Sequence, residues 1–205
     1  MRPDMYFSVD VEADGPIPGP FSMLSFGVAV AGVRTAADRS DPTQGFEPFD
    51  PTARTFYREL RPISPDFDPA ALAVSGLDRA ALLAGGTEPA VALTEFDAWV
   101  RATAGEARPV VVGYPACYDW MFLYWYLIRF AGTSVFGHSG CLDLKTLYAT
   151  KAGVPLSGAV KARMPRHLLS RRPHTHHALD DAIEQAELCA NLMAWSGRDR
   201  PVAGS

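Results

Sequence analysis

The pattern of apolar and polar positions divides the chain into a strand-rich first part and a helix-rich second part. Largely apolar runs at 6–11 and 22–33 and the segment 55–60 predict three strands, which we expect to form an antiparallel meander. The Gly- and Pro-rich residues 15–20 predict a loop between the first two strands. Residues 34–54 are rich in Asp, Pro, Thr and Gly, so we expect a long turn there.

Helical spacing of apolar residues governs the rest of the chain. It predicts helices over 69–74, 78–83, 88–104, 119–130, 142–152 and 177–195. A β-branched run at 110–112 predicts a buried strand among these helices, and Gly197 is placed to end the last of them. A meander followed by alternating helix and strand predicts an α/β fold: a mixed central sheet flanked by helices, in one domain over residues 1–205.

Composition and charge limit the class of protein. Of the 205 residues, 48% are hydrophobic and 20% are charged, which is ordinary for a globular protein. The three cysteines include no CxxC pair, so we expect reduced thiols rather than disulfides or a zinc cluster. No segment resembles a signal peptide or reaches the ~18 apolar residues of a membrane span, so we expect a soluble, cytoplasmic protein. The net charge of −4 disfavours a passive nucleic-acid-binding protein but not an enzyme whose carboxylates hold Mg²⁺.

Two carboxylates stand at the end of the first predicted strand. Asp10 and Glu12 are two residues apart, so on a strand their side chains point to the same face. Neighbouring like charges are unfavourable unless a cation lies between them, and Mg²⁺ prefers carboxylate oxygens. Taken alone, however, such a pair is more often a solvated strand end.

Two further aspartates open predicted helices. For Asp119 and Asp143 alike, capping of the helix N-terminus is the simpler interpretation. Asp119 can combine that role with a place in a site only if its carboxylate faces a cleft. We keep the cap interpretation for Asp143.

A group of histidines and a basic run surround the start of the last helix. His176 stands five residues before Asp181, in a segment from which its imidazole can reach over a cleft that Asp181 faces. The alternative is that His174, His176 and His177 form a surface cluster or an adventitious metal site. The preceding basic run holds no acid and comprises Lys151, Lys161, Arg163, Arg166, Arg171 and Arg172. Such a run is usually a solvated face, but beside a carboxylate cluster it suits capture of a phosphate backbone.

The order of these motifs resembles the DEDDh family of 3′→5′ exonucleases, which have a ribonuclease H-like fold. The DxE motif of that family matches Asp10 and Glu12, and its second motif matches Asp119 with Phe122 and Leu123. Its third motif, HxAxxD, matches His176, Ala178 and Asp181. The chain departs from the family in having Ala13 after the DxE motif and Tyr114-Pro115 before the second motif, which puts the substrate preference in doubt.

The resemblance implies a mechanism with two divalent cations, Mg²⁺ or Mn²⁺. They are expected to be held by Asp10, Glu12, Asp119 and Asp181, with Asp10 bridging the pair. His176 is then the general base that takes a proton from the attacking water. Asp180, next to Asp181, is expected at the surface or in a supporting position.

The implied substrate is single-stranded RNA or DNA with a free 3′ end, which is shortened to nucleoside 5′-monophosphates. RNA or short oligonucleotides are slightly favoured, because no added DNA-binding module is evident, and a homodimer agrees with the resemblance. Expected substrate contacts are Phe21, Met23, Leu24, Tyr118, Arg163 and Arg166. Two alternatives remain: a non-catalytic 3′-end-binding module of the same fold, and a metal phosphohydrolase with histidine ligands.

Overall fold

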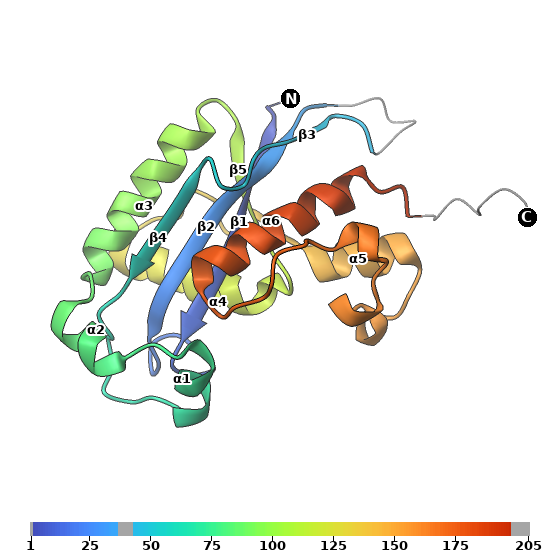
Figure 1. Cartoon of the computed structure of the whole chain (residues 1–205). Coiled ribbons are helices and arrows are strands. Elements are labelled where there is room, and N and C mark those ends of the chain that lie inside the picture. Colours follow the sequence, from blue (N-terminus) through green and yellow to red (C-terminus); the bar gives the residue numbers. More distant parts are fainter. Residues whose placement is uncertain (1, 37–42, 198–205) are drawn as a thin grey trace, which may run out of the picture.

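A mixed six-stranded sheet forms the centre of the computed structural model, which describes residues 2–36 and 43–197 (Figure 1). The strands are β1 (Asp4–Ala13), β2 (Met23–Arg34), β3 (Phe46–Pro48), β4 (Thr55–Glu59), β5 (Arg108–Gly113) and β6 (Cys141–Asp143). β2 lies antiparallel to β1, and β3 and β4 pair with opposite ends of β2. On the other side of β1, β5 and β6 run parallel to it and to each other.

Helices cover both faces of this sheet (Figure 1). They are α1 (Pro69–Ser75), α2 (Arg79–Gly85), α3 (Pro89–Ala104), α4 (Ala116–Tyr126), α5 (Leu144–Ala152) and α6 (Ala178–Ala194). α3 and α4 pack on one face, and α5 and α6 pack on the other. The predicted α/β fold with a helix-flanked mixed sheet is therefore confirmed.

Alternating residue size along β2 explains why the two faces differ. Phe26, Val28 and Val30 point to the side of α3 and α4 and belong to an aromatic-rich core cluster. The other face presents Gly27 and Ala29, and small residues let the backbone of a helix approach closely. α6 lies there and makes extensive contacts with β1 and β2.

Several element boundaries differ from the prediction. The segment 34–54 contains β3 as well as a turn, although its residues 37–42 lie outside the described residues. β6 precedes α5, and the chain between α5 and α6 forms three short 3₁₀ turns, Leu156–Gly158, Lys161–Arg163 and Arg166–Leu168. α6 is capped by Trp195, so the prediction that Gly197 ends it is wrong. None of the described helices is both long enough and apolar enough to cross a membrane.

The helix that carries Asp119 begins earlier than predicted. α4 starts at Ala116, after a cis Tyr114–Pro115 peptide bond, and continues into a π-helical turn at Leu127–Ala131. Asp119 therefore lies inside the first turns, and its interpretation as a helix cap is wrong. Asp143 does cap α5, because its Oδ1 accepts the Thr146 N–H at 2.6 Å.

Candidate active site

Three carboxylates converge where β1 ends. Asp10 and Glu12 lie on one face of β1, and Asp181 approaches from the first turn of α6. One oxygen from each of the three lies within 4.8 Å of the others. Asp181 is fully buried and Glu12 is nearly so.

Asp119 joins this group through the edge of β1. Pairing between β1 and β5 stops at Ser8, so the following part of β1 is open on that side. Asp119 lies there, and its Oδ1 accepts the Val11 N–H at 3.1 Å. The carboxylate thus completes the edge of the strand, and its charge acts on Asp10, so Asp119 lies beside the other carboxylates.

The four carboxylates are held together against their mutual repulsion. Burial, and then the charges of the other three, raise the pKa of Asp10 well above its ordinary range. Burial raises the pKa of Glu12 to about 7 and that of Asp119 to about 8. A divalent cation relieves such repulsion, because hard cations prefer carboxylate oxygens. The donor set therefore fits one or more ions of this kind.

Asp181 also organises the loop that carries the histidines. Its two oxygens accept the backbone N–H groups of Thr175 and His176, each at 2.8 Å. His176 adopts a left-handed conformation with φ of 57°, which is unusual for a residue with a side chain and common at functional sites. One ring nitrogen of His176 lies within 4.8 Å of an Asp181 carboxylate oxygen.

His177 turns away from the carboxylates. Its ring lies against Tyr57, with 4.8 Å between the ring centroids, and its Nδ1 is 3.4 Å from Asp180 Oδ2. Asp180 is exposed at the surface, as expected. The geometry thus places His176 and not His177 at the acidic cluster.

Comparison with known proteins decides the family. No family model matches the chain. The chain is 38% identical over 194 residues to the 3′-5′ DNA exonuclease Cap18 of Escherichia coli, and the match covers 92% of each protein. The chain belongs to the DEDDh family of 3′→5′ exonucleases.

Solved structures of low sequence identity share the fold of this exonuclease. One is the nuclease domain of 3'hExo, a DEDDh family member, bound to rAMP: the TM-score is 0.64 at 15% identity, over 92% of this chain and 90% of that one. Another solved structure concerns the 3′-end-specific recognition of the histone mRNA stem-loop by a 3′-exonuclease. Its TM-score is 0.66 at 13% identity. The match covers 94% of this chain but 64% of that longer one.

Gln185 belongs to the candidate site, although the sequence motifs do not include it. It lies on α6 one turn after Asp181, and its Nε2 donates to Asp10 Oδ1 at 3.0 Å. Its Oε1 accepts the Tyr114 N–H at 2.5 Å. The buried amide thus orients the Asp10 carboxylate from α6. Its spacing of four residues from Asp181, on the same side of a helix, was the signal that could have found it.

The expected base-contacting residues differ in their exposure. Met23 and Leu24 are fully buried, because helices cover both faces of β2, so their side chains offer no surface to a substrate. Phe21 is half-buried beside the loop at Gly15. Tyr118 is 36% exposed, and its hydroxyl donates to the Gly15 carbonyl at 2.8 Å. We retain Phe21 and Tyr118 as candidate contacts and drop the other two.

Acidic residues of α6 form ion pairs with two members of the predicted basic run. Lys161 forms an ion pair with Glu184, and Arg172 Nε donates to Glu187 Oε1 at 2.8 Å. Lys151 donates to the carbonyls of Leu192 and Trp195 at the end of α6. The remaining members of the run are Arg163, Arg166 and Arg171, for which the described part of the chain contains no ion-pair partner.

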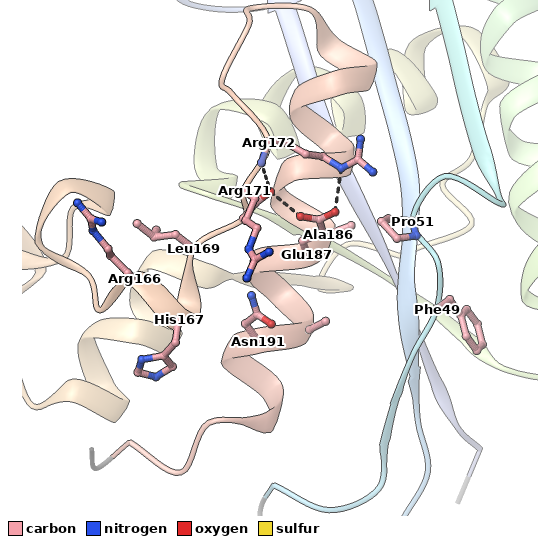
Figure 2. Close-up of a pocket in the computed structure, with 12 residues that line it drawn as sticks. Phe49, Pro51, Arg166, His167, Leu169, Arg171, Arg172, Ala186, Glu187 and Asn191 are labelled. Carbon is pink, nitrogen blue, oxygen red and sulfur yellow. Dashed lines mark hydrogen bonds and ion pairs between the residues drawn. The ribbon is translucent and has the colours of Figure 1, made fainter. Parts of the chain in front are cut away.

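Two of these arginines line a groove beside α6 (Figure 2). The groove has a volume of about 1090 Å³ and lies between the segment 166–172, the turn at Pro51 and α6. The charge of Glu187 is neutralised there by Arg172, and the Ser170 hydroxyl also donates a hydrogen bond to Glu187. Arg166 and Arg171 therefore give the groove a net positive charge. Arg163 is exposed but does not line it.

A close backbone contact sets the position of α6. A Cβ added to Gly27 would lie 2.3 Å from the backbone of Ala178 and Leu179, and Gly27 is the β2 partner of Asp10. We expect Gly27→Ala to push α6, and with it Asp181, away from Asp10. The variant should lose about 1–3 kcal/mol of unfolding free energy and most of its nuclease activity.

Gly85→Ala is the matched control for this substitution, because nothing lies within 4 Å of a Cβ at Gly85. The control should be as stable as the parent or slightly more so. Urea unfolding and an exonuclease assay on both variants check this. Equal activity of the two variants would show that the close approach of α6 does not position the site.

Proposed function

We propose that this chain removes nucleotides one at a time from the 3′ end of single-stranded DNA, with two divalent cations, Mg²⁺ or Mn²⁺. The observation that carries the proposal is the convergence of four carboxylates at the end of β1. The residues proposed to hold the cations are Asp10, Glu12, Asp119 and Asp181. When bound, such cations lower the pKa of water and stabilise charge on the leaving oxygen.

The protein side chains have distinct proposed roles. His176 accepts the proton of the attacking water, since imidazole exchanges protons near neutral pH. Asp181 anchors the loop of His176 through two backbone N–H groups, so it fixes the base relative to the carboxylates. Gln185 holds Asp10 in orientation. The product is a nucleoside 5′-monophosphate.

The choice of DNA rests on the similarity to a protein named a DNA exonuclease. The sequence alone slightly favours RNA, because no added DNA-binding module is evident. A relative with 38% identity over 92% of the chain is stronger support, and it favours DNA. A mixture of DNA and RNA strands of one sequence, each with its own 5′ label, tests the proposal in a single reaction. We expect the DNA to shorten faster. Faster shortening of the RNA would reject DNA as the preferred substrate.

The basic groove is proposed to bind phosphates of the strand away from its 3′ end. Glu187 follows Asp181 by six residues, so the groove lies about 9 Å farther along α6. At ~3.4 Å per nucleotide, about 9 Å corresponds to about three nucleotides, so a strand whose 3′ end is at the carboxylates reaches Arg166 and Arg171 only if it is longer than a dinucleotide. The groove should therefore matter for longer strands and not for dinucleotides.

Substitution of Arg171 tests this role of the groove. Arg171→Gln removes one phosphate contact, so the slope of log affinity for a long DNA strand against log salt should become less negative by about 0.7. Cleavage of a dinucleotide should be unchanged. Arg101→Gln is the control, because Arg101 is paired with Asp97 on α3 at the opposite face of the sheet. An unchanged salt slope for Arg171→Gln in a binding titration would exclude the groove from the strand path.

A further inference from the structure

We propose that His174, His176 and Asp181 form a separate site for Zn²⁺, and that its occupation inhibits the nuclease. The proposal rests on the proposed function in one respect: inhibition presupposes that the chain is a nuclease. One ring nitrogen of each histidine and one Asp181 oxygen lie within 4.8 Å of one another. This group contains two nitrogen donors, whereas Asp10, Glu12 and Asp181 offer oxygen alone.

The distances suit a tetrahedral ion. Ligand atoms about 2.0–2.1 Å from a tetrahedral zinc lie ~3.3 Å from one another. His174 Nδ1 is 3.1 Å from Asp181 Oδ2, so two of the three donors already have nearly this separation. The His176 nitrogen lies within 4.8 Å of these two atoms, and its ring is exposed, so the side chain has room to turn toward an ion.

The backbone holds both imidazoles on the same side of the loop. The left-handed conformation of His176 turns the chain there, and the His174 and His176 ring centroids are 4.5 Å apart. Asp181 fixes this arrangement by accepting the N–H groups of Thr175 and His176. His174 is half-exposed, so an ion can reach the site from solvent and keep a water ligand.

Ligand type separates the two sites chemically. Imidazole nitrogen favours Zn²⁺ over Mg²⁺, and carboxylate oxygen favours Mg²⁺ and Mn²⁺. Zn²⁺ should therefore enter the histidine site at concentrations where Mg²⁺ does not.

Asp181 belongs to both groups, and this shared ligand explains inhibition. An ion held by His174, His176 and Asp181 takes a carboxylate from the acidic cluster. It also occupies a ring nitrogen of His176, the residue that is proposed to accept a proton. The two sites cannot both function, so Zn²⁺ inhibition should weaken as Mg²⁺ rises.

The test is titration of nuclease activity with Zn²⁺ at constant Mg²⁺. His174→Ala should keep most of its activity without Zn²⁺, and the Zn²⁺ concentration for half inhibition should rise by more than about tenfold, since one of three ligands is lost. His177→Ala is the control and should be inhibited like the parent, because His177 faces Tyr57. Equal Zn²⁺ sensitivity of His174→Ala and the parent would overturn the proposal.

A calorimetric titration with Zn²⁺ keeps the proposal testable even if no nuclease activity is found. Asp10→Ala removes a carboxylate that is outside the histidine site. This variant should still bind one Zn²⁺, and the double variant with His174→Ala should lose that binding. Zn²⁺ binding that survives in the double variant would contradict the histidine site, whatever the outcome of the nuclease assays.

Discussion

Replacement of His176 by alanine should lower kcat by about 10²–10⁴-fold, which is the range for loss of a general base. The stability of the protein should change little, because the His176 side chain is exposed and the loop is held through backbone N–H groups. The substitution should leave the KM for DNA nearly unchanged, since the base acts on the attacking water. Initial rates over a range of strand concentrations measure both constants.

His177→Ala is the matched control for the same loop. It removes an imidazole of the same kind one residue away, which packs on Tyr57 and pairs with Asp180. We expect its kcat to stay within a few-fold of the parent. An inactive His177→Ala protein together with an active His176→Ala protein would reverse the assignment of the base.

Asp119→Asn should abolish most of the nuclease activity and yet stabilise the metal-free protein at pH 8. A bound cation stabilises the charge of the transition state by several kcal/mol. Loss of one of its ligands removes part of this stabilisation, which corresponds to a decrease in rate of about 10²-fold or more. The asparagine is isosteric, and its carbonyl oxygen can still accept the Val11 N–H. The gain in stability follows from removal of a buried charge among like charges.

The stability effect has a defined pH dependence. Burial raises the pKa of Asp119 to about 8 in the folded protein, from 3.8 in the absence of such an environment. Between these values the folded state binds more protons than the unfolded state, so stability falls as pH rises. In EDTA, the difference in melting temperature between Asp119→Asn and the parent should thus be larger at pH 8 than at pH 5.

Divalent cations should act in the opposite direction. Mg²⁺ or Mn²⁺ binds the folded parent and raises its melting temperature by mass action. The same ions should raise the melting temperature of Asp119→Asn much less, because this variant lacks one of the proposed ligands. An Asp119→Asn protein that is less stable than the parent at both pH values would show that the carboxylate is not held under repulsion.

The acidic part of the site was predictable because its members follow local rules. Asp10 and Glu12 share a face of β1 through the two-residue repeat of a strand, and the structure brings them within 4.8 Å of Asp181. The spacing of His176 from Asp181 likewise reflects one loop and one helical turn. Local rules could not predict where α4 begins. An aspartate such as Asp119 can accept the free N–H groups of a helix N-terminus or of a strand edge equally well.

Contacts between residues far apart in the sequence determine two short strands, the pairing of the basic residues and the burial of two expected substrate contacts. β3 and β6 each have three residues, too few for a periodic pattern, and they are strands only through their pairing partners. The basic run is continuous in the sequence, because Glu184 and Glu187, which neutralise two of its members, come from α6. Met23 and Leu24 were expected at the substrate, but a strand sequence does not reveal whether both faces of its sheet are covered.

One digestion tests most directly whether the four carboxylates at the end of β1 serve the removal of nucleotides from a 3′ end. A 5′-labelled single-stranded DNA is incubated with Mg²⁺ and the parent protein, with Asp10→Ala, and with the parent in EDTA. We expect a ladder that shortens from the 3′ end with the parent alone, and intact DNA in the other two reactions. An intact strand with the parent, with Mg²⁺ or with Mn²⁺, in protein whose melting curve shows that it is folded, would contradict the account and favour a module that binds 3′ ends without cutting them.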